Sequence, residues 1–217
     1  RITVRHIGGG NRVKYRIIDF DLSNMSNSGI SNVGIVAKSN FQSLMDHVGS
    51  GSAYDLSKRR SNLSILPPYD GKAFSSFVET IYNMHGYIEH CREEYVLISQ
   101  GNVITNIDYT DVFDFHSKKK ADITLIYKNH AIPQGYDRPI TLDVDNDGKV
   151  NQIFVKPGVV DKEVFNHAYG SILIKKDILM SEIRNAISVN QLDVKRLLQS
   201  SLGKYSIYAY ENKGYCA

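Results

Sequence analysis

Apolar residues along the chain fall into short runs and spaced stripes that predict alternating strands and helices. The clearest run is 95–98, and four consecutive apolar residues between polar ones are typical of a buried strand. The clearest stripe is in 73–91, where apolar residues recur at spacings of three and four: Phe77, Ile81, Met84 and Ile88. Since these spacings bring side chains to one face, 73–91 is predicted to form one amphipathic helix.

The rest of the first half continues this alternation. Strands are predicted at 13–20, 33–37, 63–66 and 123–127. Helices are predicted from Asp21 or Ser23 to about 28, at 41–48 and at 109–120. Such alternation is typical of an α/β fold with a mostly parallel, doubly wound sheet and helices on both faces.

The second half of the chain changes character. Residues 140–144 and 150–155 both alternate like strands, and Asp147-Gly148 between them predicts a β-hairpin. The same turn resembles a calcium loop, but Phe154 occupies the place of that loop's last acidic ligand, which favours the hairpin. The remaining elements are strands at 171–174 and 205–210 and helices at 177–189 and 193–202.

Composition narrows the class of protein. With 217 residues, 42% of them hydrophobic, the chain fits one large globular domain or two small ones, and no apolar run reaches the roughly 18 residues of a membrane helix. The net charge of +3 is small, and the basic triplets 58–60 and 118–120 are typical of solvated surface rather than of a nucleic-acid stripe. Cys91 and Cys216 form no CxxC pair, which predicts a reducing, cytoplasmic environment. We therefore expect neither a membrane nor a nucleic acid as a partner.

Candidate chemistry centres on the break after 95–98. In open α/β sheets, ligands bind just beyond the carboxyl ends of the strands, and here small polar residues follow the strand before a new helix begins near Asp108. The side chain at the expected site is Asn102 rather than an acid. The sequence contains no HExxH, GxSxG or Walker A motif, and its histidines show no metal-ligand spacing.

A Gly-rich stretch, 6–12, is a second candidate. A loop that cradles phosphate needs such a stretch between a strand and a helix whose N-terminus points at the anion. Because 13–20 is predicted to be a strand, the pattern favours an ordinary loop over a phosphate site.

Motifs through most of the chain resemble those of the glucose-1-phosphate adenylyltransferase family, also called ADP-glucose pyrophosphorylase. They are YRIIDF at 15–20, LSN at 22–24, NSGI at 27–30, NVGI at 32–35, SLMDH at 43–47, GSG at 49–51, ILPP at 65–68, EYV at 94–96, NIDY at 106–109, ADIT at 121–124, VKP at 155–157 and IYAY at 207–210. The resemblance therefore covers about residues 13–217.

This resemblance implies an activity and an architecture. Members of the family join glucose 1-phosphate to the adenylyl group of ATP and release pyrophosphate. They contain a Rossmann-like nucleotidyltransferase domain followed by a left-handed β-helix, and they form allosterically regulated tetramers in glycogen or starch synthesis. We therefore expect 1–217 to be one nucleotidyltransferase-like domain of a longer protein. Its nucleotide loop, before Tyr15, is expected to be incomplete or altered, and the C-terminal β-helix is absent from this chain.

Several functional positions of the family can be matched to residues of this chain. The metal-binding Ser-Gly-Asp corresponds to 100–102, so the neutral amide of Asn102 stands where a carboxylate binds Mg²⁺. The family's second metal aspartate would lie just past Ala217. By the same resemblance, Lys156 and Asp193 are implied to bind the sugar phosphate.

The resemblance also assigns positions nearer the N-terminus. Lys14 and Arg16 match basic positions of the family's effector region. The family's Gly-Thr-Ala-Asp-Ala helix start corresponds to 76–80, where only Glu79 keeps an acid, and it is the third expected substrate-binding residue.

These departures are typical of the family's D-type subunit, which implies a regulatory or weakly catalytic role in which Mg²⁺ binding is doubtful. The expected partners are a catalytic adenylyltransferase subunit or further copies of the same chain. Two alternatives remain open. A displaced acid, Asp108 or Asp111, would supply the metal ligand of a competent enzyme, although Asp108 also fits a helix cap. Alternatively, the chain is a non-catalytic scaffold that senses a sugar phosphate through Lys156, although Lys156 also fits a surface lysine and Asp193 a helix cap.

Overall fold

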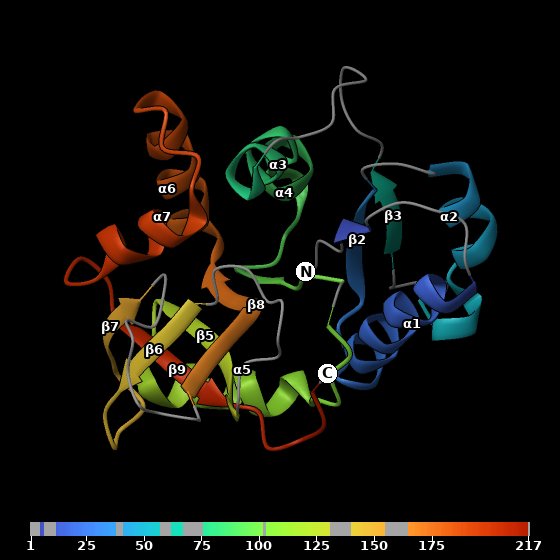
Figure 1. Cartoon of the computed structure of the whole chain (residues 1–217). Coiled ribbons are helices and arrows are strands. Elements are labelled where there is room, and N and C mark those ends of the chain that lie inside the picture. Colours follow the sequence, from blue (N-terminus) through green and yellow to red (C-terminus); the bar gives the residue numbers. More distant parts are fainter. Residues whose placement is uncertain are drawn as a thin grey trace. The chain divides into compact units, whose positions relative to one another are not determined.

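The computed structural model describes residues 5–6, 12–37, 41–56, 62–66, 76–101, 103–130, 140–154 and 165–216, with side chains from Ile17 onward. The chain divides into two compact units (Figure 1). The first unit comprises Arg1–Ser75, Leu97–Asp111 and Gly214–Ala217, and the second comprises Ser76–Val96 and Val112–Lys213.

A parallel sheet in the order β1-β2-β3 belongs to the first unit. Its strands are β1 (Arg5–His6), β2 (Asn32–Ala37) and β3 (Asn62–Leu66), and the accompanying helices are α1 (Arg12–Asn27), α2 (Phe41–Val48) and the 3₁₀ helix η1 (Ser52–Tyr54). Every residue of β2 after Asn32 is buried, which is typical of the middle strand of a parallel sheet. The strands predicted at 33–37 and 63–66 and the helix predicted at 41–48 are confirmed.

Helix α1 corrects the prediction that 13–20 forms a strand. The most deeply buried apolar side chains of α1 are Ile18, Leu22 and Met25, each at most 1% exposed. Their spacings of four and three place them on one face of a helix, whereas a strand would have turned alternate residues to opposite sides. The adjacent β-branched pair at 17–18 suggested a strand, but this longer stripe decides the structure.

The second unit is built around a mixed sheet in the order β7-β6-β8-β5-β9, with β4 paired to β8. Its strands are β4 (Tyr95–Ile98), β5 (Ile123–His130), β6 (Ile140–Val144), β7 (Val150–Phe154), β8 (Phe165–Lys175) and β9 (Ile207–Glu211). Its helices are α3 (Phe77–Asn83), α4 (His85–His90), α5 (Tyr109–Lys119), α6 (Lys176–Ser188) and α7 (Val194–Ser201). The first two residues of β4 and most of α5 belong to this unit, and their other residues belong to the first unit.

The pairing in this sheet differs from a purely parallel sheet. β5 and β9 are parallel, as the alternation of strands and helices predicts. The pairs β5–β8, β6–β7 and β6–β8 are antiparallel. The antiparallel part comes from the second half of the chain, where strands follow one another through short turns instead of through helices.

The predicted hairpin between β6 and β7 is confirmed. Asp145 Oδ1 accepts hydrogen bonds from the backbone N–H groups of Asp147 at 2.9 Å and Lys149 at 2.8 Å. Gly148 has a φ of +84°, which a side chain would disfavour. The carboxylate of Asp145 thus stabilises the turn of the hairpin.

The prediction of one continuous helix over 73–91 is wrong. Within the described part, Met84 separates α3 from α4. Its backbone N–H donates to the carbonyl of Ile81, and its ψ is 4°. Met84 and Ile88 are nevertheless buried, so the predicted apolar stripe is retained across the break. The start of the predicted helix, 73–75, lies outside the described residues.

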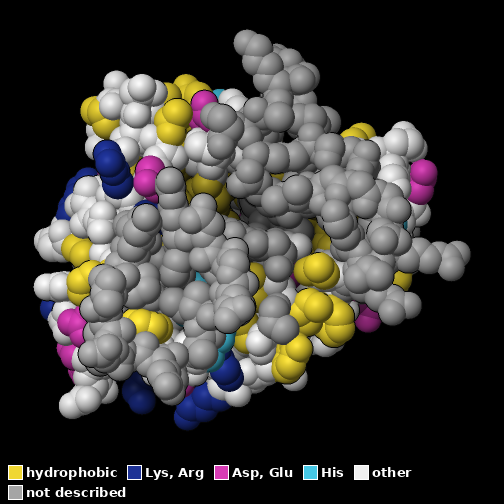
Figure 2. Space-filling model, in the orientation of Figure 1, with side chains coloured by type: hydrophobic (Ala, Val, Ile, Leu, Met, Phe, Trp, Pro, Cys, Tyr) yellow, Lys and Arg dark blue, Asp and Glu magenta, His cyan; other side chains and the backbone are white. Residues whose placement is uncertain are grey.

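The described surface agrees with the modest net charge. On the face in Figure 2, the described Lys and Arg side chains form small separate groups and no continuous stripe. None of the helices that the structure describes is long and apolar enough to span a bilayer.

Candidate functional site

The candidate site is the segment that follows β4, residues 99–109, which we call the strand-end segment. It begins after the last residue of β4, Ile98, which is 1% exposed. Ligands of α/β folds bind at such a position. Asn102, the residue matched to the family's metal aspartate, lies outside the described residues, so the site is built here from its neighbours.

Helix α1 and the turn that follows it present three polar side chains to this segment. Asp21, Asn24 and Ser28 are spaced by three and four residues and therefore lie on one face. The Ser99 hydroxyl donates to Asp21 Oδ2 at 3.3 Å. Asn24 Nδ2 donates to the carbonyl of Thr105 at 2.7 Å.

The third contact lies at the far end of the strand-end segment. Ser28 Oγ accepts the backbone N–H of Tyr109 at 2.8 Å, and it donates to the carbonyl of Asn24 at 2.6 Å. The backbone N–H of Asn106 bonds to the carbonyl of Tyr215 at 2.9 Å. The strand-end segment is thus held near its start, middle and end, chiefly by one face of α1.

Asp21 is the unusual member of this face. It is 1% exposed, although carboxylic acids are rarely buried unless they are paired. Burial raises the pKa of Asp21 to about 7, and the hydrogen bond from Ser99 opposes this only partly. The carboxyl group of Asp21 therefore titrates near neutral pH.

Asp108, near the other end of the strand-end segment, stabilises the start of α5. Its Oδ1 accepts the backbone N–H of Thr110 at 2.8 Å, at the start of α5. Hydrogen bonds from Thr110, and secondarily one from Ser28, lower the pKa of Asp108. Asp108 thus acts as a helix cap, whereas Asp111 is exposed in the first turn of α5.

The described acids do not gather into a cluster of metal ligands. Mg²⁺ needs several oxygen ligands in an open octahedral arrangement. Asp21 is buried against Ser99, and the carboxylate of Asp108 is occupied by the start of α5. Across the described ranges, no three His, Cys, Asp or Glu side chains lie close enough together to hold a metal ion.

The other expected site residues have separate positions. Glu79 completes a capping box at α3, in which its carboxylate accepts the N–H of Ser76 at 3.0 Å and its own N–H bonds to Ser76 Oγ at 3.1 Å. Asp193 caps α7 by accepting the N–H of Lys195 at 2.9 Å. Lys14 and Arg16 belong to α1, but their side chains, like all of Lys156, lie outside the described residues.

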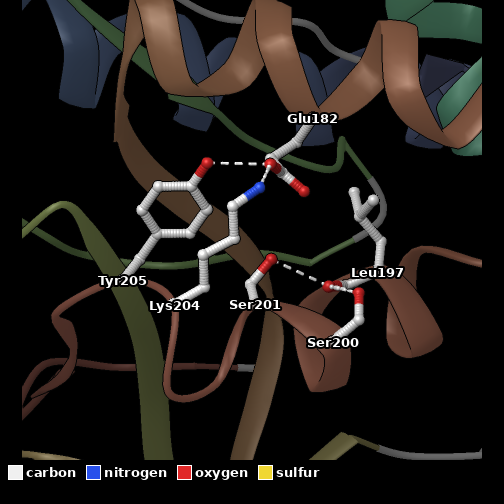
Figure 3. Close-up of polar contacts among 6 residues, drawn as sticks. All are labelled: Glu182, Leu197, Ser200, Ser201, Lys204 and Tyr205. Carbon is white, nitrogen blue, oxygen red and sulfur yellow. Dashed lines mark hydrogen bonds and ion pairs between the residues drawn. The ribbon is translucent and has the colours of Figure 1, made fainter.

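A second polar cluster, in the second unit, was not expected from the sequence. Glu182 of α6 accepts hydrogen bonds from Tyr205 Oη at 2.8 Å and from Lys204 Nζ (Figure 3). Burial alone would raise the pKa of Glu182, but the bonds from Lys204 and Tyr205 outweigh it and lower the pKa. These bonds tie α6 to the turn that follows α7, and so help to place the helix that Asp193 caps.

Two buried acids that the sequence analysis did not identify, Asp21 and Glu182, can be recognised from their positions in the sequence. Asp21 falls within the apolar stripe of α1, next to buried Leu22. Glu182 likewise falls on the buried face of α6, beside Ile183. An acid on the apolar face of a helix indicates a buried polar partner elsewhere in the fold.

The second unit also has a pocket of about 500 Å³ between α4 and α6. It is lined by Glu89, Lys176, Asp177, Met180, Ser181 and Arg184. Arg184 pairs with Glu89, and Lys176 Nζ donates to the carbonyl of Cys91 at 2.8 Å. With two acids and two bases in its lining, the pocket has no net charge that would select a phosphate.

The sequence of the chain is similar to a known protein family and to several curated relatives. The nucleotidyl transferase family matches residues 11–204. The chain is 34% identical over 212 residues to the glucose-1-phosphate adenylyltransferase of Clostridium acetobutylicum, and 32% identical over 214 residues to that of Bacillus subtilis. Each alignment covers 93% of this chain and 54% of the relative, so the chain spans about half the length of these curated relatives. The resemblance inferred from the motifs is thereby confirmed.

A solved structure supports the fold independently. It is that of a Bacillus anthracis protein assigned as a glucose-1-phosphate thymidylyltransferase, in complex with sucrose. The match has a TM-score of 0.75 at 11% identity and covers 100% of this chain and 88% of the other. At this identity the likeness shows the fold alone, and the expected Rossmann-like nucleotidyltransferase fold is confirmed.

Proposed function

Because the chain belongs to the nucleotidyl transferase family, we propose that residues 1–217 form the nucleotidyltransferase-like domain of a glucose-1-phosphate adenylyltransferase subunit. The similarity to adenylyltransferases over 93% of the chain carries this proposal. In the proposed reaction, a phosphate oxygen of glucose 1-phosphate bonds to the α-phosphorus of ATP, and pyrophosphate leaves. The product is ADP-glucose, the glucosyl donor for glycogen. A cytoplasmic location agrees with this role and with Cys91 and Cys216, neither of which forms a disulfide.

We further propose that the subunit is regulatory or weakly catalytic, like the family's D-type subunit. Asn102 carries this part, because an amide oxygen binds Mg²⁺ more weakly than a carboxylate does. A displaced acid is less well supported, since the carboxylate of Asp108 is used by the start of α5. The natural partner is then a catalytic adenylyltransferase subunit, with a homo-oligomer as the alternative.

Substrate groups are assigned by the family resemblance. Lys156 and Asp193 would hold the sugar phosphate, Glu79 would lie near the substrate, and Lys14 with Arg16 would belong to the effector region. Because α1 replaces the predicted strand at 13–20, the Gly-rich stretch 7–11 now stands between β1 and a helix. The reason for preferring an ordinary loop at 6–12 therefore no longer holds, and residues 7–11 themselves lie outside the described residues.

The test is coexpression of the full-length protein with a catalytic adenylyltransferase subunit from the same source. Pyrophosphate release from ATP and glucose 1-phosphate is measured for each protein alone and for the purified complex. We expect little turnover from this protein alone, and a change in the rate or effector response of the complex. Ordinary enzyme rates without a partner would exclude the regulatory role, and no binding of ATP or glucose 1-phosphate in either setting would exclude the family function.

A further inference from the structure

Asp21 is a buried acid that the proposed reaction does not use. It lies on α1 among apolar side chains, with Ile18 one turn before it and Met25 one turn after it, both at most 1% exposed. Its recorded partner is the Ser99 hydroxyl, at 3.3 Å. Ser99 is the first residue after β4, three positions before Asn102. A group that carries a proton near neutral pH is therefore joined to the start of the strand-end segment.

The same face of α1 contacts the segment twice more, which makes the Asp21 link consequential. Asn24 bonds to Thr105 and Ser28 bonds to Tyr109, so two later points of the segment are also held. A change at Ser99 therefore acts first on the start of the segment, before Thr105.

We infer that Asp21 is a positioning residue whose protonation, through Ser99, sets how firmly the start of the strand-end segment is held to α1. The catalytic consequence rests on the proposed function, whereas the link between Asp21 and Ser99 does not. In the protonated form, the neutral carboxyl group remains in the apolar interior and keeps its bond to Ser99. In the ionised form, a buried charge has one hydroxyl donor and gains solvation only if the segment opens.

Other charged groups near α1 have partners of their own. Asp19, two residues earlier, accepts from His47 Nε2 of α2 at 2.8 Å and from the Tyr54 hydroxyl of η1. Asp108, across the strand-end segment, caps α5. For Asp21 itself, burial raises the pKa and the hydrogen bond from Ser99 partly opposes the rise. Among the described groups, no neighbouring charge contributes to this shift.

The test measures amide hydrogen exchange of residues 97–107 in the full-length protein between pH 6 and pH 8, corrected for the intrinsic rate. With a pKa of about 7, the ionised fraction of Asp21 rises about tenfold over this range. We expect protection of these amides to fall about tenfold in the wild type. Asp21→Asn keeps an oxygen that accepts from Ser99 but cannot ionise, so its protection should be independent of pH.

Asp46→Asn is the matched control. Asp46 is an exposed acid on α2 in the same unit, and this variant should follow the wild type. Equal pH dependence in the wild type and Asp21→Asn would overturn the inference. If Asp21→Asn does not fold, Ser99→Ala decides, because it keeps the carboxyl group and removes the link. Because the hydrogen bond from Ser99 lowers the pKa of Asp21, the pH dependence of these amides should then move to higher pH, and an unchanged dependence would also overturn the inference.

Calorimetric titration with ATP and Mg²⁺ at pH 6 and pH 8 separates this inference from the proposed function. We expect the affinity to change with pH in the wild type about as the exchange does, and to be constant in Asp21→Asn. A wild type that binds no ATP at either pH contradicts the proposed function. The exchange measurements still decide the role of Asp21 in that case.

Discussion

His116 of α5 is a buried histidine whose surroundings favour the neutral ring. It is 1% exposed, its Nδ1 lies 2.8 Å from the Thr124 hydroxyl, and its ring meets the ring of Tyr95 edge-on at 5.3 Å. Burial, and secondarily the positive charge of Lys175, lower the pKa of His116 to about 4. An unfolded chain, by contrast, takes up a proton at this residue near pH 6.5.

This difference predicts acid sensitivity. Between pH 6.5 and 4 the unfolded state binds a proton at His116 that the folded state does not, so stability is full above pH 6.5 and falls as the pH drops through this range. The contribution lost is about 3 kcal/mol. His116→Gln should remove about this much of the pH dependence, measured by urea unfolding at pH 4.5 and 7. His85→Gln, at an exposed histidine, should not, and parallel curves for wild type and His116→Gln would contradict the assignment.

Glu182 makes a second residue-scale prediction. Its side chain is 8% exposed and its carboxylate accepts from both Tyr205 and Lys204, so its removal leaves a half-buried hydroxyl without its acceptor. We expect Glu182→Ala to lower the free energy of unfolding by about 2 kcal/mol, and Glu182→Gln by less, because the amide oxygen still accepts. Lys204→Ala should cost clearly less than Glu182→Ala, because the lysine is half exposed. Denaturant unfolding at pH 7 measures all three, and equal losses would place the energy in the ion pair instead.

At the scale of elements, the turn between α2 and η1 offers a matched pair of glycines. Gly49 and Gly51 both have positive φ, at +55° and +75°. A Cβ at Gly49 would meet nothing within 4 Å, whereas at Gly51 it would lie 2.7 Å from Leu63 Cδ2 and 3.3 Å from Leu56 Cβ. Gly49→Ala should therefore cost only the backbone strain, about 1 kcal/mol.

Gly51→Ala adds a packing conflict with β3 to the same strain. We expect it to cost about 2–4 kcal/mol in total, since Leu63 has to move away from the new methyl group. Thermal unfolding of both variants gives the comparison. Equal losses would mean that the side chain of Leu63 moves aside freely.

Elements were predictable where local pattern and tertiary packing agree. The strand 95–98 and the hairpin at Asp147-Gly148 follow from apolar runs and turn residues. β8 was predicted only at 171–174 but runs over Phe165–Lys175. Its first half contains Asn166 and His167, which have little strand propensity, and pairing with β5 and β6 makes it a strand.

At the scale of the whole molecule, sequence reasoning predicted the strand that the candidate site follows but not the contacts that hold the strand-end segment. The end of β4 was predictable from one apolar run and the rule for α/β sheets. The face of α1 that holds the strand-end segment was not, because it joins residues about 80 positions apart, such as Asn24 and Thr105. Placing Asp21 at the start of a short helix also hid its position inside the buried stripe of the longer helix α1.

The sharpest prediction for the molecule as a whole concerns Asn102. If the missing carboxylate limits activity, Asn102→Asp in the full-length protein should restore Mg²⁺-dependent nucleotide binding. Turnover with ATP and glucose 1-phosphate should rise about tenfold or more, because an anionic oxygen again binds the cation. Asn106→Asp adds the same charge four residues later, at an exposed position of the strand-end segment, and should leave both unchanged. A gain in both variants would indicate a general charge effect. No gain in Asn102→Asp would favour a metal ligand supplied from elsewhere, or a subunit whose other altered positions also prevent the reaction.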